Sequence, residues 1–252
     1  MRTRTSAVLA GAVIVGIALT GCATTAPGTD EPQVTGLTTE QAERLAVTRF
    51  RNFDAGVREV TVTVTGSDTG EISVDGWYDY AAHTGYGSAT SAGADAGLVW
   101  WSADTIATRE GATGEDTAPL PLPEDGWLSG ALDPSSTNLA NALALVTNLG
   151  SDRPENPQLL AQSDAAFLEK DTIDGTAVEV FIGPSADGAA ESTPAESTAA
   201  ADLTTRARYW VDSTGTLLRF EAPLGDGSTG ATAIVELGET ADVELPTTVP
   251  GT

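Results

Sequence analysis

The sequence predicts an α+β fold, in which one strongly curved antiparallel sheet carries helices on its concave face. Runs of alternating apolar and polar residues, bounded by Gly, Asp and Ser turn signals, occur in two groups along the chain. Segments with helical periodicity stand before the first group and between the two groups, which favours separate layers of helix and sheet. With 252 residues and 40% hydrophobic side chains, the chain is able to bury a sizeable core.

The N-terminus has the pattern of a lipoprotein signal peptide. Arg2 and Arg4 precede an apolar run that is shorter than the roughly 20 residues a membrane-spanning helix needs. The run ends in a Leu-Thr-Gly-Cys motif at Cys22, which resembles a bacterial lipobox. We therefore expect residues 1–21 to be cleaved and Cys22 to carry diacylglycerol and palmitate. The alternative is an uncleaved anchor with an incidental cysteine.

A lipidated Cys22 places the rest of the chain at the outer, extracytoplasmic face of the cell membrane. Each buried acyl methylene contributes roughly 0.8 kcal/mol, so two or three chains hold a protein there durably. Residues 22–36 are rich in Pro, Gly and Thr and are expected to form a flexible tether. Residues 37–246 are then expected to form a single domain. Because Cys22 is the only cysteine, this domain has no thiol for a disulfide.

The net charge of the chain limits the classes of molecule that it is able to bind. The formal net charge is −24, and a surface so acidic is repelled by nucleic acid, which we exclude as a partner. Abundant Ala, Gly, Thr and Asp with a single lysine is also typical of actinobacterial proteins, so the acidity is in part background.

The first helix and the first group of strands follow the tether. A capping box at Thr38 and Gln41 starts a helix that is expected to end at Gly56. Alternation of valine and threonine predicts a strand from Val57 to Thr65. Further strands are expected at 72–80, 83–90, 98–102 and 104–109.

A long Gly- and Pro-rich loop at 111–134 leads to a second helix at 135–149, which ends at Gly150. This helix lacks charged residues, so it is either buried on all sides or covers an apolar hollow. Later strands are expected at 167–182, as a hairpin turning at Asp174, then at 206–211, 217–222 and 231–237, with a short strand near Val243. The low-complexity stretch 183–202 is expected to be a disordered insertion.

The order of these elements resembles the LolA-like lipid and lipoprotein carriers, nearest the LppX and LprG type of actinobacterial lipoprotein. The motif that carries the resemblance is aromatic-x-Val-Asp-x-x-Gly-x-Leu-x-Arg, which runs here from Tyr209 to Arg219. The resemblance covers most of residues 37–245 and implies a half-open β-barrel whose concave face and helices enclose an apolar cavity for acyl chains. The 111–134 loop and the 183–202 insertion depart from the compact family pattern and leave the strand register open.

This resemblance and the apolar surface of the second helix together suggest which residues line a lipid cavity. Neighbouring residues of a strand point to opposite faces, so only one of Trp100 and Trp101 is able to face the cavity. The loop 111–134 is a candidate lid. The expected cavity residues are Trp100, Leu139, Ala142, Leu143, Val146, Leu149 and Trp127. The competing interpretation of the same residues is ordinary packed core.

Signals for catalysis are weak. The chain has one histidine, His83, and no Gly-x-Ser-x-Gly motif, so we expect no enzyme activity, no metal and no cofactor. A Gly-x-Gly-x-x-Gly string at 225–230 precedes a strand instead of a helix, so it is interpreted as a turn.

The sequence thus favours a membrane-anchored binder or carrier of a lipid or other amphiphile. The alternative is an envelope adaptor or sensor-accessory lipoprotein that is packed with its own side chains and binds another exported protein.

Overall fold

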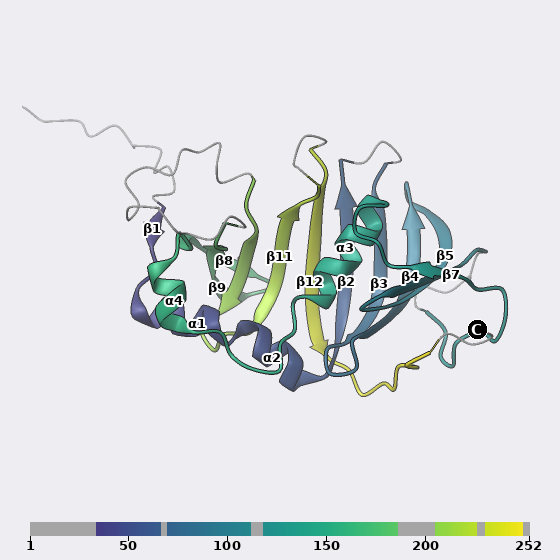
Figure 1. Ribbon diagram of the computed structural model, residues 1–252, viewed down its shortest axis with the longest axis horizontal. Helices are drawn as coiled ribbons and strands as arrows, with labels where there is room; N and C mark the ends of the chain where they lie inside the picture. The colour runs from purple at the N-terminus through teal and green to yellow at the C-terminus, as the bar shows by residue number, and fades with distance from the viewer. Residues whose placement is uncertain (1–33, 67–69, 112–117, 186–204, 226–229, 249–252) are drawn as a thin grey trace, which may run out of the picture. The chain divides into compact units, whose positions relative to one another are not determined.

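The computed structural model describes residues 34–66, 70–111, 118–185, 205–225 and 230–248. The signal peptide 1–21, Cys22, most of the 22–36 tether and most of the 183–202 insertion lie outside the described residues. The expected fold class is confirmed. Twelve antiparallel strands form one open sheet, and the helices lie along one of its faces (Figure 1).

The sheet has the strand order β1-β8-β9-β10-β11-β12-β2-β3-β4-β5-β6-β7. The strands are β1 (Thr35–Gly36), β2 (Val57–Thr65), β3 (Ile72–Asp79), β4 (Thr84–Ser91), β5 (Ala94–Ser102), β6 (Thr105–Arg109), β7 (Leu128–Ala131), β8 (Ala166–Ile173), β9 (Thr176–Ile182), β10 (Arg208–Asp212), β11 (Leu217–Pro223) and β12 (Thr232–Thr240). The helices are α1 (Thr39–Ala46), α2 (Thr48–Ala55), α3 (Asn138–Thr147) and α4 (Pro157–Gln162).

Two meanders make up the sheet, and β12 joins them. Strands β2 to β7 pair in sequence order, as the short turns between most of them predict, and β8 to β11 do the same. β12, the last strand in the chain, lies between β11 and β2 and pairs antiparallel with both. The expected strand near Val243 is wrong, because residues 241–246 run alongside without joining the sheet.

The first helical segment differs from the single helix that was expected. The capping box at Thr38 and Gln41 is present, but the helix is divided at Val47 into α1 and α2. The Thr48 hydroxyl donates to the carbonyl oxygen of Arg44, and such back-bonding by threonine tends to bend helices. The β-branched side chain of Val47 also has a low helix propensity.

Three short elements were not expected. β7 lies inside the predicted 111–134 loop, β1 takes the last two residues of the predicted tether, and α4 follows α3. Each has six residues or fewer, too few for a period to be read from sequence. α4 nevertheless has a recognisable start, because the Asn156 side chain caps a helix that begins at Pro157.

Buried side chains divide between the two faces of the sheet. On the face that carries the helices, Tyr78, Gly85 and Trp101 lie opposite one another on β3, β4 and β5. One residue away, Trp77, Tyr86 and Trp100 form the equivalent row on the other face. We call these surfaces the helix face and the outer face.

Candidate binding site beneath helix α3

Helix α3 is the expected uncharged helix, and its local structure follows from its sequence. The Thr137 hydroxyl caps its start by accepting a hydrogen bond from the Ala140 amide over 3.0 Å. No residue between Asn138 and Thr147 is exposed, and none is charged. Ala142, Leu143 and Val146 are completely buried, so the helix lies deep against the sheet.

The surface beneath α3 is apolar and aromatic. α3 crosses β2 on the helix face, near the middle of the sheet (Figure 1). Its buried residues belong to one cluster with side chains from the two strand groups and from β12. The sheet contributes Val60, Val62, Val64, Val74, Tyr78, Val99, Trp101, Phe220, Val235 and Leu237.

The C-terminal end of α3 is fixed by polar side chains of α2. Arg49 donates to the carbonyl oxygens of Asn148 over 2.8 Å and of Gly150 over 3.3 Å. Asn52, which is fully buried, donates to the carbonyl oxygen of Leu149 over 2.8 Å. A cation at this position also complements the negative end of the helix dipole. The described contacts of the N-terminal end include the Thr137 cap but no equivalent set of arginine or asparagine bonds.

Arg58 of β2 connects this anchor to the sheet. Its guanidinium is buried, and all five of its N–H groups donate: to the side chain of Asn52 and to the carbonyl oxygens of Leu217, Leu237 and Gly238. Burial lowers the pKa of Arg58 from its usual value, and the nearby Tyr80 and Asp212 oppose that shift. The sequence interpretation did not single out Arg58, although it shares the parity of Val60 and Val62 in β2.

The structure brings together five of the seven expected cavity residues and separates the other two. Leu139, Ala142, Leu143, Val146 and Leu149 all face or adjoin the helix-face cluster.

Trp100 and Trp127 belong instead to the outer-face cluster, with Tyr86 and Leu98. The parity argument was correct that Trp100 and Trp101 point apart, but Trp101 is the one that faces α3. It does so because its ring lies over the backbone of Gly85, where a Cβ atom would come within 2.3 Å of the ring.

The predicted lid also lies on the outer face. Ala118 and Leu122, from the 111–134 segment, pack against Trp100, and the Tyr86 hydroxyl donates to the carbonyl oxygen of Pro119 over 2.9 Å. Trp127 donates to the carbonyl oxygen of Pro123. Residues 118–127 of this segment therefore cover the sheet surface opposite α3, whereas Leu132 belongs to the helix-face cluster together with α3.

Buried polar atoms beneath α3 were not expected from the sequence. The Tyr80 hydroxyl and the Trp101 indole nitrogen are buried and have no hydrogen-bond partner among the described residues, and the buried Tyr78 hydroxyl has the Thr147 hydroxyl as its neighbour. Burial raises the pKa of Tyr78 to about 12, with the neighbouring Thr147 hydroxyl acting in the opposite direction. The pKa of Tyr80 rises further, again through burial. Both phenols are therefore uncharged donors at neutral pH.

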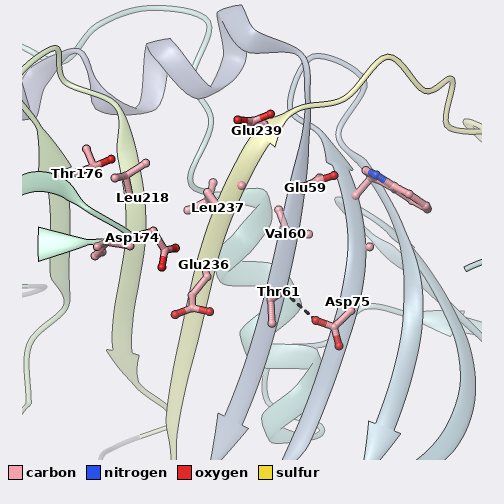
Figure 2. Close-up of a pocket in the computed structure, with 14 residues that line it drawn as sticks. Glu59, Val60, Thr61, Asp75, Asp174, Thr176, Leu218, Glu236, Leu237 and Glu239 are labelled. Atoms are coloured by element: carbon pink, nitrogen blue, oxygen red, sulfur yellow. Dashed lines mark hydrogen bonds between the residues drawn. The ribbon is translucent and has the colours of Figure 1, made fainter. Parts of the chain in front are cut away.

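Four hollows can be described, and one of them borders the N-terminal end of α3 at Asn138 and Asn141. The one in Figure 2 has a volume of about 630 Å³ and lies on the outer face. Carboxylates line it, and one of them, Asp75, accepts a hydrogen bond from the Thr61 hydroxyl over 2.8 Å. Such a surface repels the anionic headgroups of lipids. Neither this hollow nor the other three that can be described is lined by Leu143 or Val146.

Among the described residues, no group of three or more His, Cys, Asp or Glu side chains is arranged to hold a metal ion. Within the same residues, no helix combines the length and the apolar character that a membrane crossing needs.

Comparison with known proteins gives structural similarities only. No protein-family profile and no curated protein matches the chain. The lipoprotein LppX of Mycobacterium tuberculosis is similar over 82% of this chain and 98% of its own, with 16% identity and a TM-score of 0.44. A LolA superfamily protein of Nitrosomonas europaea covers 86% of this chain and 98% of its own, with 10% identity and a TM-score of 0.29.

A domain from Vibrio parahaemolyticus, described as a putative outer membrane lipoprotein-sorting protein, matches over 83% of this chain and 94% of its own. Its identity is 12% and its TM-score 0.26. These structures come from the group of proteins that the sequence resembles. All three TM-scores lie below 0.5.

Proposed function

We propose that the chain is a membrane-anchored, extracytoplasmic lipoprotein that binds a lipid or other amphiphile between α3 and the helix face. The observation that carries this proposal is α3 itself. It has no charged and no exposed residue, and it lies on an apolar and aromatic sheet surface as a separate layer. A surface of this kind suits acyl chains, whose burial stabilises a complex by roughly 0.8 kcal/mol per methylene. The lipobox at Cys22 supports a site close to a membrane.

Entry of an acyl chain requires α3 to move away from the sheet, because Leu143 and Val146 are packed without a described hollow behind them. Arg49 and Asn52 hold the C-terminal end of the helix. The N-terminal end is capped by the single Thr137 hydroxyl. We therefore expect the N-terminal end to separate first, with the helix turning about its fixed C-terminal end.

The proposal is tested by native mass spectrometry of the chain from residue 30 onward, purified without detergent. This chain carries all the described strands and helices. We expect a stoichiometric adduct that solvent extraction identifies as a lipid, or one that forms when lipids are added. If neither the purified chain nor a panel of added lipids and detergents gives an adduct, the proposal is wrong.

The alternative, an adaptor filled by its own side chains, is favoured by the close packing of Leu143. Leu143→Trp distinguishes the two, with Leu98→Trp as the matched control on the outer face. If α3 is able to lift, Leu143→Trp blocks lipid uptake at a smaller cost in the free energy of unfolding than Leu98→Trp. If α3 is a fixed part of the core, Leu143→Trp lowers the free energy of unfolding by about 1–3 kcal/mol, as overpacking typically does. In that case neither the parent chain nor the variant binds lipid.

A further inference from the structure

The middle of the outer face carries an open hollow. The segments 118–122 and 243–246 pack further along the sheet, over Tyr86 and Trp100 of β4 and β5. The hollow of about 630 Å³ lies instead on β12, β2 and β3, beside the turn between β8 and β9 (Figure 2). Glu59, Glu236 and Glu239, which line it, are exposed. This stretch of the sheet is therefore open to solvent and available to a partner.

The hollow is strongly acidic. Among the described residues that line it, none is basic and five carry carboxylates: Glu59, Asp75, Asp174, Glu236 and Glu239. They come from β2, β3, β12 and the β8–β9 turn, and Figure 2 shows them around one space. Like charges held this close repel one another, so a cation from outside stabilises the arrangement.

Most of these carboxylates have no internal counter-charge. The carboxylate of Glu236 lies 3.9 Å from the guanidinium of Arg219, and Asp75 accepts hydrogen bonds from hydroxyl groups. The carboxylates of Glu59, Asp174 and Glu239 form no hydrogen bond or ion pair with the described residues. Three charges are thus left for a partner to pair with.

An aromatic ring adjoins this charge. Trp77 lines the hollow and is the cross-strand partner of Glu59. Gly238 of β12 leaves room for Glu59 on its other side, since a Cβ atom at Gly238 would come within 2.9 Å of the carboxylate. A ring next to a carboxylate suits the guanidinium of arginine, which stacks on aromatic faces and pairs with carboxylates at its edge.

The same face of the sheet contains such an arrangement that is completed by the chain's own arginines. The guanidinium carbons of Arg208 and Arg219 lie 5.6 Å and 5.3 Å from the centroid of the Trp210 ring. Glu221 forms ion pairs with both arginines, over 2.7 Å and 2.5 Å. At Trp77 the ring and the carboxylates are present, but the lining residues include no arginine. The comparison identifies arginine as the missing component.

The extent of the hollow indicates more than one arginine. Glu236, Thr61 and Asp75 are partners across β12, β2 and β3, so the backbones that carry the two carboxylates lie two strand spacings apart, about 10 Å. Alternate residues of an extended peptide project to one side about 7 Å apart, and long arginine side chains bridge the difference. A hollow of about 630 Å³ also exceeds the size of a single guanidinium group.

We propose that the outer face at β12, β2 and β3 docks an extended, arginine-bearing segment of another protein. One arginine stacks on Trp77 and pairs with Glu59, and a second lies between Asp75 and Glu236. This site is on the opposite side of the sheet from α3, so the inference goes beyond the proposed function and does not depend on it.

The experiment measures binding of short capped peptides to the chain from residue 30 by fluorescence anisotropy. The probe has arginine and glycine at alternate positions, with three arginines and an uncharged dye. Two matched probes replace arginine by lysine or by citrulline, its uncharged analogue. The variants are Glu59→Gln with Glu239→Gln, and Trp77→Leu. The control is Glu43→Gln with Glu110→Gln, which changes the net charge equally at two exposed residues outside the hollow.

We expect the arginine peptide to bind the parent chain more tightly than the lysine peptide does, and the citrulline peptide not to bind. Glu59→Gln with Glu239→Gln should weaken binding of the arginine peptide about 10-fold, as for two exposed ion pairs, and the control less than about 2-fold. Trp77→Leu should weaken it about 3-fold, with a smaller effect on the lysine peptide. Affinity should also fall when NaCl is raised from about 50 mM to about 300 mM.

Four results overturn the proposal. The first is that the arginine peptide does not bind the parent chain, and the second is that citrulline binds equally well. An equal loss in the control variant would mean general attraction to an acidic protein instead of docking at this hollow. Equal affinities of the parent chain for the arginine and lysine peptides would exclude stacking on Trp77, and this test holds even if Trp77→Leu does not fold.

Discussion

The two faces of the sheet are covered in different ways. On the helix face, α3 lies over the strands, and the partly exposed Arg49 and the buried Asn52 and Arg58 form a polar network that fixes its end. Two extended segments, residues 118–122 and residues 243–246, cover the outer face over Tyr86 and Trp100. Tyr86 donates a hydrogen bond to the carbonyl oxygen of Pro119 in the first segment, and Trp100 donates one to that of Pro246 in the second.

The two faces also differ in how the polar atoms of their buried aromatic residues are hydrogen-bonded. In the aromatic row of the outer face, Tyr86 and Trp100 bond through their polar atoms to the segments that cover them. In the equivalent row beneath α3, the Trp101 indole nitrogen has no hydrogen-bond partner among the described residues, and the Tyr78 hydroxyl has only the neighbouring Thr147 side chain of α3. A covering that bonds to the aromatic residues below it is typical of permanent structure.

Among the substitutions that test this difference between the two faces, Arg58→Ala is expected to change the free energy of unfolding most. The substitution removes five hydrogen bonds, to the side chain of Asn52 and to the carbonyl oxygens of Leu217, Leu237 and Gly238, four of which end on buried or partly buried backbone. We expect the free energy of unfolding to fall by about 4 kcal/mol in urea titrations. Arg153→Ala is the control, because Arg153 is exposed and pairs with its neighbour Asp152, and it should unfold like the parent chain. Equal stability of the two variants would contradict the role of Arg58.

Two substitutions of intermediate effect on stability compare α3 directly with the segment that covers the outer face. Leu143→Ala on α3 and Leu245→Ala on the outer-face segment remove the same side chain from buried positions. We expect a loss of about 4 kcal/mol for Leu143→Ala, which is completely buried in the larger helix-face cluster, and about 2 kcal/mol for Leu245→Ala, which belongs to the smaller outer-face cluster. Thermal unfolding followed by circular dichroism measures both. A larger loss for Leu245→Ala would reverse the comparison.

The smallest effect concerns single hydroxyls. Tyr86→Phe removes the hydrogen bond to Pro119 and should destabilise the free protein by about 1 kcal/mol. Tyr80→Phe removes a buried hydroxyl that has no partner and should leave stability unchanged or slightly raised. Chemical denaturation of the lipid-free proteins tests the pair. A loss of stability in Tyr80→Phe that equals the loss in Tyr86→Phe would mean that its hydroxyl is satisfied in the free protein.

Local patterns made much of this fold predictable. The alternation of valine and threonine in β2, the capping box at Thr38 and the uncharged sequence of α3 each specify their element through neighbouring residues alone. Long strands and amphipathic helices are the elements in which such periods are clear. β7, with four residues, has no period long enough to recognise.

The sites were less predictable because they depend on distant parts of the chain. Whether Trp100 or Trp101 faces α3 depends on Gly85, which makes room for the Trp101 ring, and on Pro246, which bonds to Trp100. Sequence parity shows that the two residues point apart but contains no information about which face receives the helix. The polar atoms beneath α3 depend likewise on Tyr78, Tyr80 and Thr84 meeting across strands, which no local pattern indicates.

The position of β12 has a consequence for the order in which the chain is able to fold. Ribosomes release a protein from its N-terminus, so β2 to β11 emerge before the strand that joins them. Until residues 232–240 are made, β2 has an unpaired edge, and the two meanders have no strand in common. Unpaired edges of this kind readily pair with other chains, and contacts between distant residues form slowly. Synthesis thus ends with the segment that unites the sheet, and a chain cut short before residue 232 has two half-sheets with exposed edges.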